Sequence, residues 1–133
     1  MSKTPATRTT RTRKKTPMTP GLPDQVAQAV AAAAGRKAMD LIVLDLRKSQ
    51  AFTDFFLICT GATTRQVQAI ADAVQSALGT HGIMPTIVEC EIRAEWVLLD
   101  YFDFIVHVFT PATREFYGLE RLWGDAERIE IPA

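Results

Sequence analysis

Residues 95–109, EWVLLDYFDFIVHVF, decide the fold of this chain. Aliphatic and aromatic side chains dominate residues 95–101 and 103–109, and this composition predicts two β-strands. The link between them is so short that the strands must form an antiparallel hairpin. Successive side chains of a strand point to opposite faces. The first strand therefore has two candidate core faces, Trp96, Leu98 and Asp100 or Val97, Leu99 and Tyr101.

Outward from the hairpin, helix and strand signals alternate along the chain. Residues 24–40 and 63–82 carry apolar side chains at helical spacing, and Thr110-Pro111 is a typical helix start. Residues 53–60, TDFFLICT, form a continuous apolar run, as in a strand covered on both faces. The sequence thus predicts an α/β fold, a mixed five-stranded sheet flanked by helices. The expected strands are 40–47, 53–60, 85–89, 95–101 and 103–109.

The last predicted helix ends at Gly124 and carries several large apolar side chains. We expect them to pack on the sheet, and the alternative is a face for self-association. The side chains concerned are Phe116, Leu119, Leu122 and Trp123.

Charge is unevenly distributed along the 133 residues. Residues 1–20 hold six basic and no acidic side chains, which leaves nine basic and fifteen acidic ones, a balance of −6, on residues 21–133. Phosphate neutralisation dominates nucleic-acid binding, so this acidic body favours a basic protein partner. A basic tail, residues 1–23, is predicted to be disordered, ahead of a folded domain at 24–133. The composition of the tail leaves three interpretations. It is a solvated segment with incidental affinity for RNA, an organelle transit peptide, or the result of cloning or a miscalled start.

The length of the apolar runs and the number of cysteines indicate the compartment in which the protein works. No apolar run approaches 18 residues, so no membrane span is predicted, and no signal-peptide h-region argues for secretion. Cys59 and Cys90 lie in strand-like segments and are expected to be small buried hydrophobes in a reducing compartment.

Catalytic and metal sites find little support in the pattern. Asp100 and Asp103 flank a turn rather than alternating on one strand face, and GATTRQ at Gly61 lacks the glycine run and lysine of a phosphate-binding loop. Cys59 and His107 lie in strands without a helix N-terminus to activate the thiol. The histidines and cysteines include no short-spaced ligand pair. We therefore predict a protein that is not an enzyme, with no metal and no cofactor.

The remaining candidate is a binding surface on the hairpin. A tryptophan with an aliphatic neighbour and a rim of carboxylates has the composition of a protein-binding hot spot. Trp96 and Leu98 supply the apolar part, although the same residues also suit an ordinary core. The rim would comprise Glu89, Glu91, Glu95 and Asp103.

Several long motifs decide between these alternatives. They are TDFFLICTG at 53–61, RQVQAIAD at 65–72, WVLLDY at 96–101, VHVF at 106–109 and REFYGLERLWGDA at 114–126. In this order and spacing they resemble the ribosomal silencing factor family, RsfS, also called the Iojap family. The resemblance runs from about residue 24 to residue 125.

The resemblance implies a translational repressor. Proteins similar to this one bind the large ribosomal subunit through its ribosomal protein fourteen and block association with the small subunit, and organelle relatives act in large-subunit assembly. The family fold is distantly similar to nucleotidyltransferases, so a nucleotide-binding enzyme is the rival hypothesis; fold alone does not carry that activity. The resemblance implies a bacterial cytoplasmic protein, or alternatively a mitochondrial or chloroplast one. It leaves open a homodimer, and the basic tail could touch ribosomal RNA.

The family's partner-facing patch maps onto the first hairpin strand and its neighbours. Trp96 would be the anchor, Leu98 its apolar companion and Asp100 a carboxylate for a basic partner. The resemblance adds Glu89, Asp103 and His107 as further members.

The chain departs from the family pattern at two positions, where Cys90 and Phe102 each replace a glycine. Glycine often serves a positive φ, for which cysteine and phenylalanine are poorly suited.

Overall fold

The computed structural model describes residues 21–49 and 51–132. Within them the strands form one sheet in the order β5-β6-β7-β4-β3-β8. β4 and β7 run parallel, whereas the other neighbouring pairs are antiparallel. The predicted mixed α/β architecture is thereby confirmed. The strands are β3 (Met39–Asp45), β4 (Phe55–Thr60), β5 (Ile87–Cys90), β6 (Trp96–Asp100), β7 (Phe104–Phe109) and β8 (Glu127–Glu130).

β8 corrects the predicted five-stranded sheet, because it adds a sixth strand in the described residues. It pairs antiparallel with β3, with Ile129 opposite Val43. Its sequence, ERIE, carries three charged side chains, and only Ile129 is partly buried. An edge strand without apolar alternation leaves no periodic signal in the sequence.

The hairpin of β6 and β7 forms as predicted, with Trp96 opposite Phe109 and Leu98 opposite His107. Burial settles which side of β6 is core. The alternate residues Val97, Leu99 and Tyr101 are buried. The other side carries Trp96, Leu98 and Asp100, which are half-buried.

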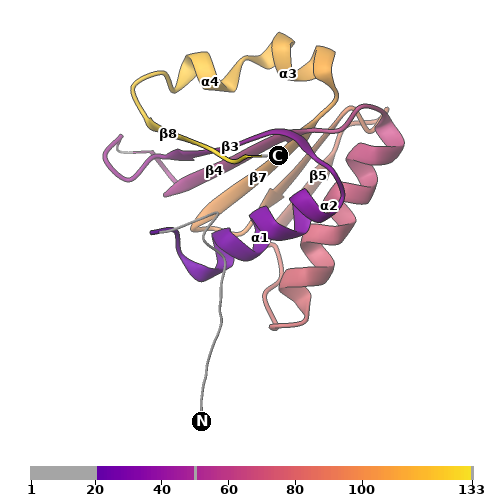
Figure 1. Ribbon diagram of the computed structural model, residues 1–133, viewed down its shortest axis with the longest axis horizontal. Helices are drawn as coiled ribbons and strands as arrows, with labels where there is room; N and C mark the ends of the chain where they lie inside the picture. The colour runs from indigo at the N-terminus through magenta and orange to yellow at the C-terminus, as the bar shows by residue number, and fades with distance from the viewer. Residues whose placement is uncertain (1–20, 50, 133) are drawn as a thin grey trace.

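Helices α1 (Asp24–Gly35) and α2 (Thr64–Gly79) cover the Val97 face of the sheet (Figure 1). Val26, Val30 and Val74 are among the fully buried side chains of the core that results. α1 is shorter than the predicted 24–40, because the chain leaves the helix at Arg36 and turns through Lys37 at φ 62°. The predicted tail lies outside the described residues except for 21–23, of which Leu22 packs against this core.

The other face is covered by two short helices, α3 (Pro111–Tyr117) and α4 (Leu119–Leu122). The single helix predicted up to Gly124 is broken at Gly118, which adopts the left-handed conformation at φ 56°. Leu119 and Trp123 pack on the sheet as predicted. Phe116 and Leu122 do not, since they are 80% and 72% exposed.

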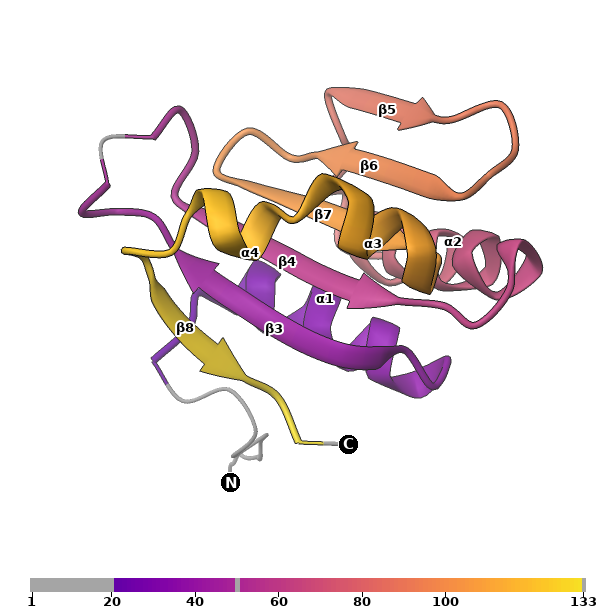
Figure 2. The same ribbon diagram turned by 90° about the horizontal axis from the view of Figure 1, so that it is seen from above.

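The short helices cover only part of their face. Seen from above, α3 and α4 run over the middle of the sheet and leave β5 and β6 open (Figure 2). All four residues of β5 are exposed. No described helix has the length and apolar character needed to cross a membrane.

Candidate protein-docking surface

The open end of this face holds a groove of about 510 Å³ between β5, β6 and α3. We call it the β5–β6 groove. Residues from three separate parts of the chain meet there. β5 pairs with β6 in a register that sets Glu89 opposite Leu98, and Tyr117 at the end of α3 contacts Trp96. Its lining comprises Val88, Glu89, Cys90, Glu91, Trp96, Leu98 and Tyr117.

Trp96 forms the inner wall of the groove and is held on several sides. Its indole Nε1 donates a hydrogen bond to Nδ1 of His107 at 3.2 Å. Its ring stacks on Phe109, with centroids 5.5 Å apart, and meets Tyr117 at 4.7 Å. A half-buried aromatic side chain fixed in this way can contact a partner with little further loss of rotamer entropy.

His107 lies beneath Trp96 rather than on the surface, with only 4% of the residue exposed. Burial penalises the charged imidazolium and lowers the pKa of His107 to about 3. The ring is therefore neutral near pH 7, and since Nδ1 accepts from Trp96, the proton sits on Nε2. No described residue accepts a hydrogen bond from that buried nitrogen. His107 thus supports the groove wall and does not face the groove.

The predicted carboxylates divide into two groups. Glu89 lines the groove beside Leu98. Asp100 and Asp103 lie at the hairpin turn, where Asp100 Oδ1 accepts a hydrogen bond from the Phe102 amide at 2.8 Å. Glu91 has a local task too, since its carboxylate accepts from the amides of Arg93 and Glu95. The surface is acidic, although part of its charge organises turns.

The two departures from the glycine pattern have opposite outcomes. Phe102 has φ 75°, the left-handed conformation that glycine adopts without strain. Cys90 lies in strand β5 with no positive φ, so it does not strain the strand. The expectation that both cysteines are buried is wrong for Cys90, whose thiol is exposed, and right for Cys59.

Three groove residues, Val88, Cys90 and Tyr117, were not among the residues predicted from the sequence, and Tyr117 lies farthest from the others along the chain. Helical spacing predicts one continuous face for the large apolar side chains between residues 116 and 123. Gly118, however, changes the chain direction directly after Tyr117. As a result Tyr117 turns toward Trp96 while Leu119 and Trp123 turn toward the sheet. Glycine at this position within REFYGLERLWGDA was the available signal.

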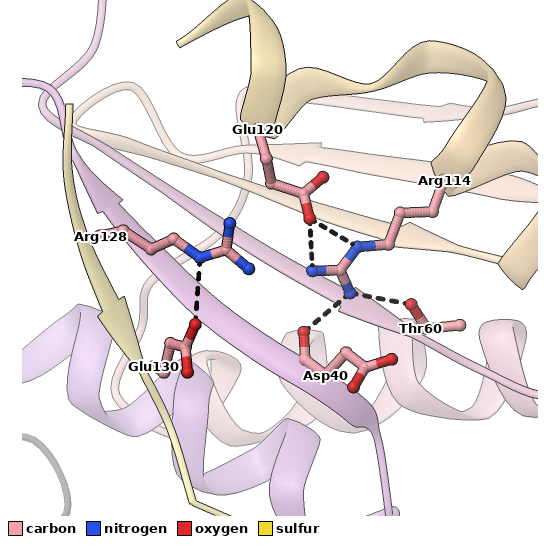
Figure 3. A network of polar contacts seen from close by, with 6 residues as sticks. All are labelled: Asp40, Thr60, Arg114, Glu120, Arg128 and Glu130. Atoms are coloured by element: carbon pink, nitrogen blue, oxygen red, sulfur yellow. Dashed lines mark hydrogen bonds and ion pairs between the residues drawn. The ribbon is translucent and has the colours of Figure 1, made fainter. Parts of the chain in front are cut away.

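A partly buried arginine, with 11% of its side chain exposed, fastens α3 and α4 to the sheet and so sets the position of Tyr117. Arg114 donates two hydrogen bonds to Glu120, at 3.1 and 2.9 Å, and Nη1 donates to the Asp40 carbonyl at 2.7 Å and to Thr60 Oγ1 at 2.9 Å (Figure 3). Burial alone would raise the pKa of Glu120, but the Arg114 hydrogen bonds outweigh it and hold the pKa below its usual value.

The geometry separates the groups that a nucleophilic site would need. Cys59 lies opposite Val108 in the β4–β7 pair, so its side chain and that of His107 project from opposite faces of the sheet. Burial also raises the pKa of the Cys59 thiol to about 12. Within residues 21–49 and 51–132, no three His, Cys, Asp or Glu side chains form a group that could hold a metal ion.

Comparison with known proteins supplies the family. A family model described as "Ribosomal silencing factor during starvation" matches residues 19–133. The chain belongs to this family, RsfS. The RsfS of Bacillus subtilis is 42% identical over 103 residues, covering 77% of this chain and 87% of that protein. A crystal structure of a Chromobacterium violaceum protein aligns with a TM-score of 0.73 at 37% identity, covering 76% of this chain and 84% of that one.

Organelle proteins are also similar to this RsfS chain. The chloroplastic protein Iojap of Zea mays is 36% identical, covering 76% of this chain and 44% of the maize protein. A Mus musculus protein named for mitochondrial assembly of the ribosomal large subunit is 26% identical, covering 77% of this chain and 46% of the mouse protein. Membership ties the chain to the ribosome and to regulation of translation, in a family of silencing factors and not of known enzymes.

Proposed function

We propose that this protein represses translation by binding the large ribosomal subunit through ribosomal protein fourteen and sterically blocking the small subunit. The observation that supports this proposal most directly is the position of Trp96, which is held rigidly at the wall of an uncovered groove lined by acidic side chains. Family membership supports a ribosomal partner, and the balance of −6 on residues 21–133 suits a basic ribosomal protein. Such repression requires no chemical turnover, only occupancy that outlasts or outcompetes the small subunit.

In this proposal the residues of the surface have distinct tasks. Trp96 is the anchor and Leu98 extends its apolar contact. Glu89, Asp100 and Asp103 offer carboxylates to basic side chains of the partner. His107 acts indirectly, because its Nδ1 fixes the indole of Trp96.

The test uses isolated large ribosomal subunits. The unmodified protein should cosediment with them and reduce the yield of joined ribosomes when small subunits are added. Trp96→Ala should weaken binding by roughly thirtyfold, the effect of losing a hot-spot side chain. Phe52→Ala is the matched control, because Phe52 is an aromatic residue that is 74% exposed and does not line the groove. Equal binding by Trp96→Ala and Phe52→Ala would place the docking surface elsewhere.

The basic tail needs its own comparison. If it only touches ribosomal RNA, removing residues 1–20 should lower affinity in a strongly salt-dependent way and leave the requirement for Trp96 intact. Loss of all binding on truncation would instead make the tail the main determinant.

A bacterial cytoplasmic location is part of the proposal, with an organelle as the alternative. Whether the protein forms a homodimer is a separate question, and sedimentation of the purified protein answers it.

A second candidate is assembly of the large subunit, favoured by the name of the mouse relative. Assembly and silencing make different predictions for mature subunits. A silencing factor blocks joining of purified mature subunits, whereas an assembly factor leaves joining unchanged and its depletion causes large-subunit precursors to accumulate. For the nucleotidyltransferase-like alternative, a nucleoside triphosphate with Mg²⁺ would have to raise the unfolding temperature. We expect no such rise.

A further inference from the structure

The two edges of the sheet differ in how they are protected. β8 carries charges at Glu127, Arg128 and Glu130, and such side chains discourage pairing with another strand. β5, with sequence IVEC, presents Ile87 at 49% and Val88 at 50% exposure. In the described part of the chain, no strand pairs with its outer side. β5 therefore has the composition of a pairing edge.

The ladder shows which backbone groups of β5 are free. The Glu91 amide donates to the Trp96 carbonyl, and residue pairs of an antiparallel ladder alternate between bonded and non-bonded. With Glu89 opposite Leu98 and Ile87 opposite Asp100, residues 87, 89 and 91 direct their backbone groups toward β6. Val88 and Cys90 consequently direct their amides and carbonyls outward, where an added strand would bond.

The surroundings favour a basic occupant over a second copy of this chain. Glu89 and Glu91 line the groove directly beside the free edge. Antiparallel pairing of two β5 strands sets Glu89 against Glu89 when Val88 lies opposite Cys90, and against Glu91 when Cys90 lies opposite Cys90, and like charges in those positions are destabilising. The register with Val88 opposite Val88 avoids this repulsion but still brings the acidic side chains of both copies to one edge. A Lys- or Arg-bearing strand would instead place its charges over these carboxylates.

We propose that β5 receives an extended, basic strand of the ribosomal partner protein, which continues the sheet while its side chains enter the β5–β6 groove. This inference rests on the proposed function and adds the mode of recognition, strand addition at one sheet edge. Main-chain hydrogen bonds would then give affinity, and the groove containing Trp96 would give specificity.

A proline at an outward position tests this mode. Val88→Pro removes an amide that points away from β6, so the β5–β6 ladder loses no hydrogen bond, and proline is tolerated at such edge positions. Val88→Ala is the matched control, because it shortens the side chain and keeps the amide. Binding of each variant to isolated large subunits is measured beside Trp96→Ala, after thermal unfolding confirms that each variant is folded. We expect Val88→Pro to bind about tenfold or more weakly than Val88→Ala.

The outcomes separate the two proposals. Equal binding by Val88→Pro and Val88→Ala, with Trp96→Ala impaired, would overturn strand addition and leave the docking surface in place. Failure of the unmodified protein to bind would overturn the proposed function and this inference together. If Val88→Pro only abolishes self-association in sedimentation, the edge joins two copies of the chain and the proposed occupant is wrong.

Hydrogen exchange gives a test that does not depend on a variant folding. In the unmodified protein on large subunits, exchange at the Val88 and Cys90 amides should slow, whereas the Glu89 amide, already bonded to β6, should change little. Unchanged exchange at Val88 and Cys90 in the bound state would contradict strand addition.

Discussion

The two faces of the sheet are closed in different ways. The face under α1 and α2 is sealed by buried aliphatic side chains from both helices, including Val30 and Leu78. The other face has two short helices without a fully buried residue, fastened by Arg114. It leaves β5 and β6 uncovered. The comparison suggests that the sealed face carries most of the folding free energy, which leaves the open face free to present a surface.

The largest effect is expected when a leucine is replaced by alanine, once on each face of the sheet. Leu78→Ala on α2 removes a fully buried side chain and should lower the free energy of unfolding by about 2–5 kcal/mol. Leu122→Ala on α4 removes a side chain that is 72% exposed and should change it by no more than about 0.5 kcal/mol. Urea denaturation measures both. Similar losses would mean that the open face shares the stability equally.

The next largest effect is expected from pH, acting on the open face through His107. Its folded-state pKa, about 3, lies below the ordinary value of 6.5, so the folded protein binds fewer protons than the unfolded chain between those values. The contribution to stability is complete above pH 6.5 and is lost as pH falls toward 3. Between pH 7 and 5 the loss should be about 2 kcal/mol.

Urea denaturation at pH 7, 6 and 5 checks this slope. His107→Gln should flatten it, and His81→Gln, at an exposed histidine in the loop after α2, should leave it unchanged. A slope that survives His107→Gln would assign the pH dependence to other groups. Glu120, whose pKa is lowered, loses its contribution only below its ordinary pKa of 4.5 and so does not obscure this range.

The fastening of α3 and α4 should come next in size. Arg114→Met removes all four of the arginine's hydrogen bonds and leaves the Glu120 carboxylate without its partner, at a cost of about 1–3 kcal/mol. Arg128→Met is the control, since its pair with Glu130 at 3.4 Å is largely exposed, and we expect a change within about 0.5 kcal/mol. Arg114→Met should also weaken ribosome binding, because Tyr117 loses its position beside Trp96. Unchanged stability and binding would show that Leu119 and Trp123 suffice to hold the helices.

The fold was predictable where its signals are local. The hairpin at 95–109 follows from two apolar strands and a short link, and α2 follows from its apolar stripe. β8 was not predictable in this way, because ERIE owes its strand structure to pairing with β3. Arg114 binds Thr60 and Asp40, which lie 54 and 74 positions before it in the sequence, and no local pattern encodes such contacts.

The candidate site shows the same division. The alternation of β6 places Trp96, Leu98 and Asp100 on one side, yet only the buried positions of Val97, Leu99 and Tyr101 show that this side faces outward. Tyr117 was missed because Gly118 redirects the chain after it. The groove itself exists because α3 and α4 stop short of β5 on their face of the sheet (Figure 2), which is a property of the packed molecule.

The smallest expected effect has the opposite sign and concerns the turn that ends β6. Phe102 has φ 75° and is 74% exposed, so the residue strains the backbone while burying little apolar surface. Phe102→Gly should therefore raise the free energy of unfolding by about 0.5–1 kcal/mol, since the relief of left-handed strain exceeds the added flexibility of the unfolded chain. Phe52→Gly is the matched control, at equal exposure and without a positive φ, and it should be destabilising. Thermal and urea unfolding of the two variants would contradict this account if Phe102→Gly proved as destabilising as Phe52→Gly, because the aromatic ring at the turn would then contribute more to stability than the strain removes.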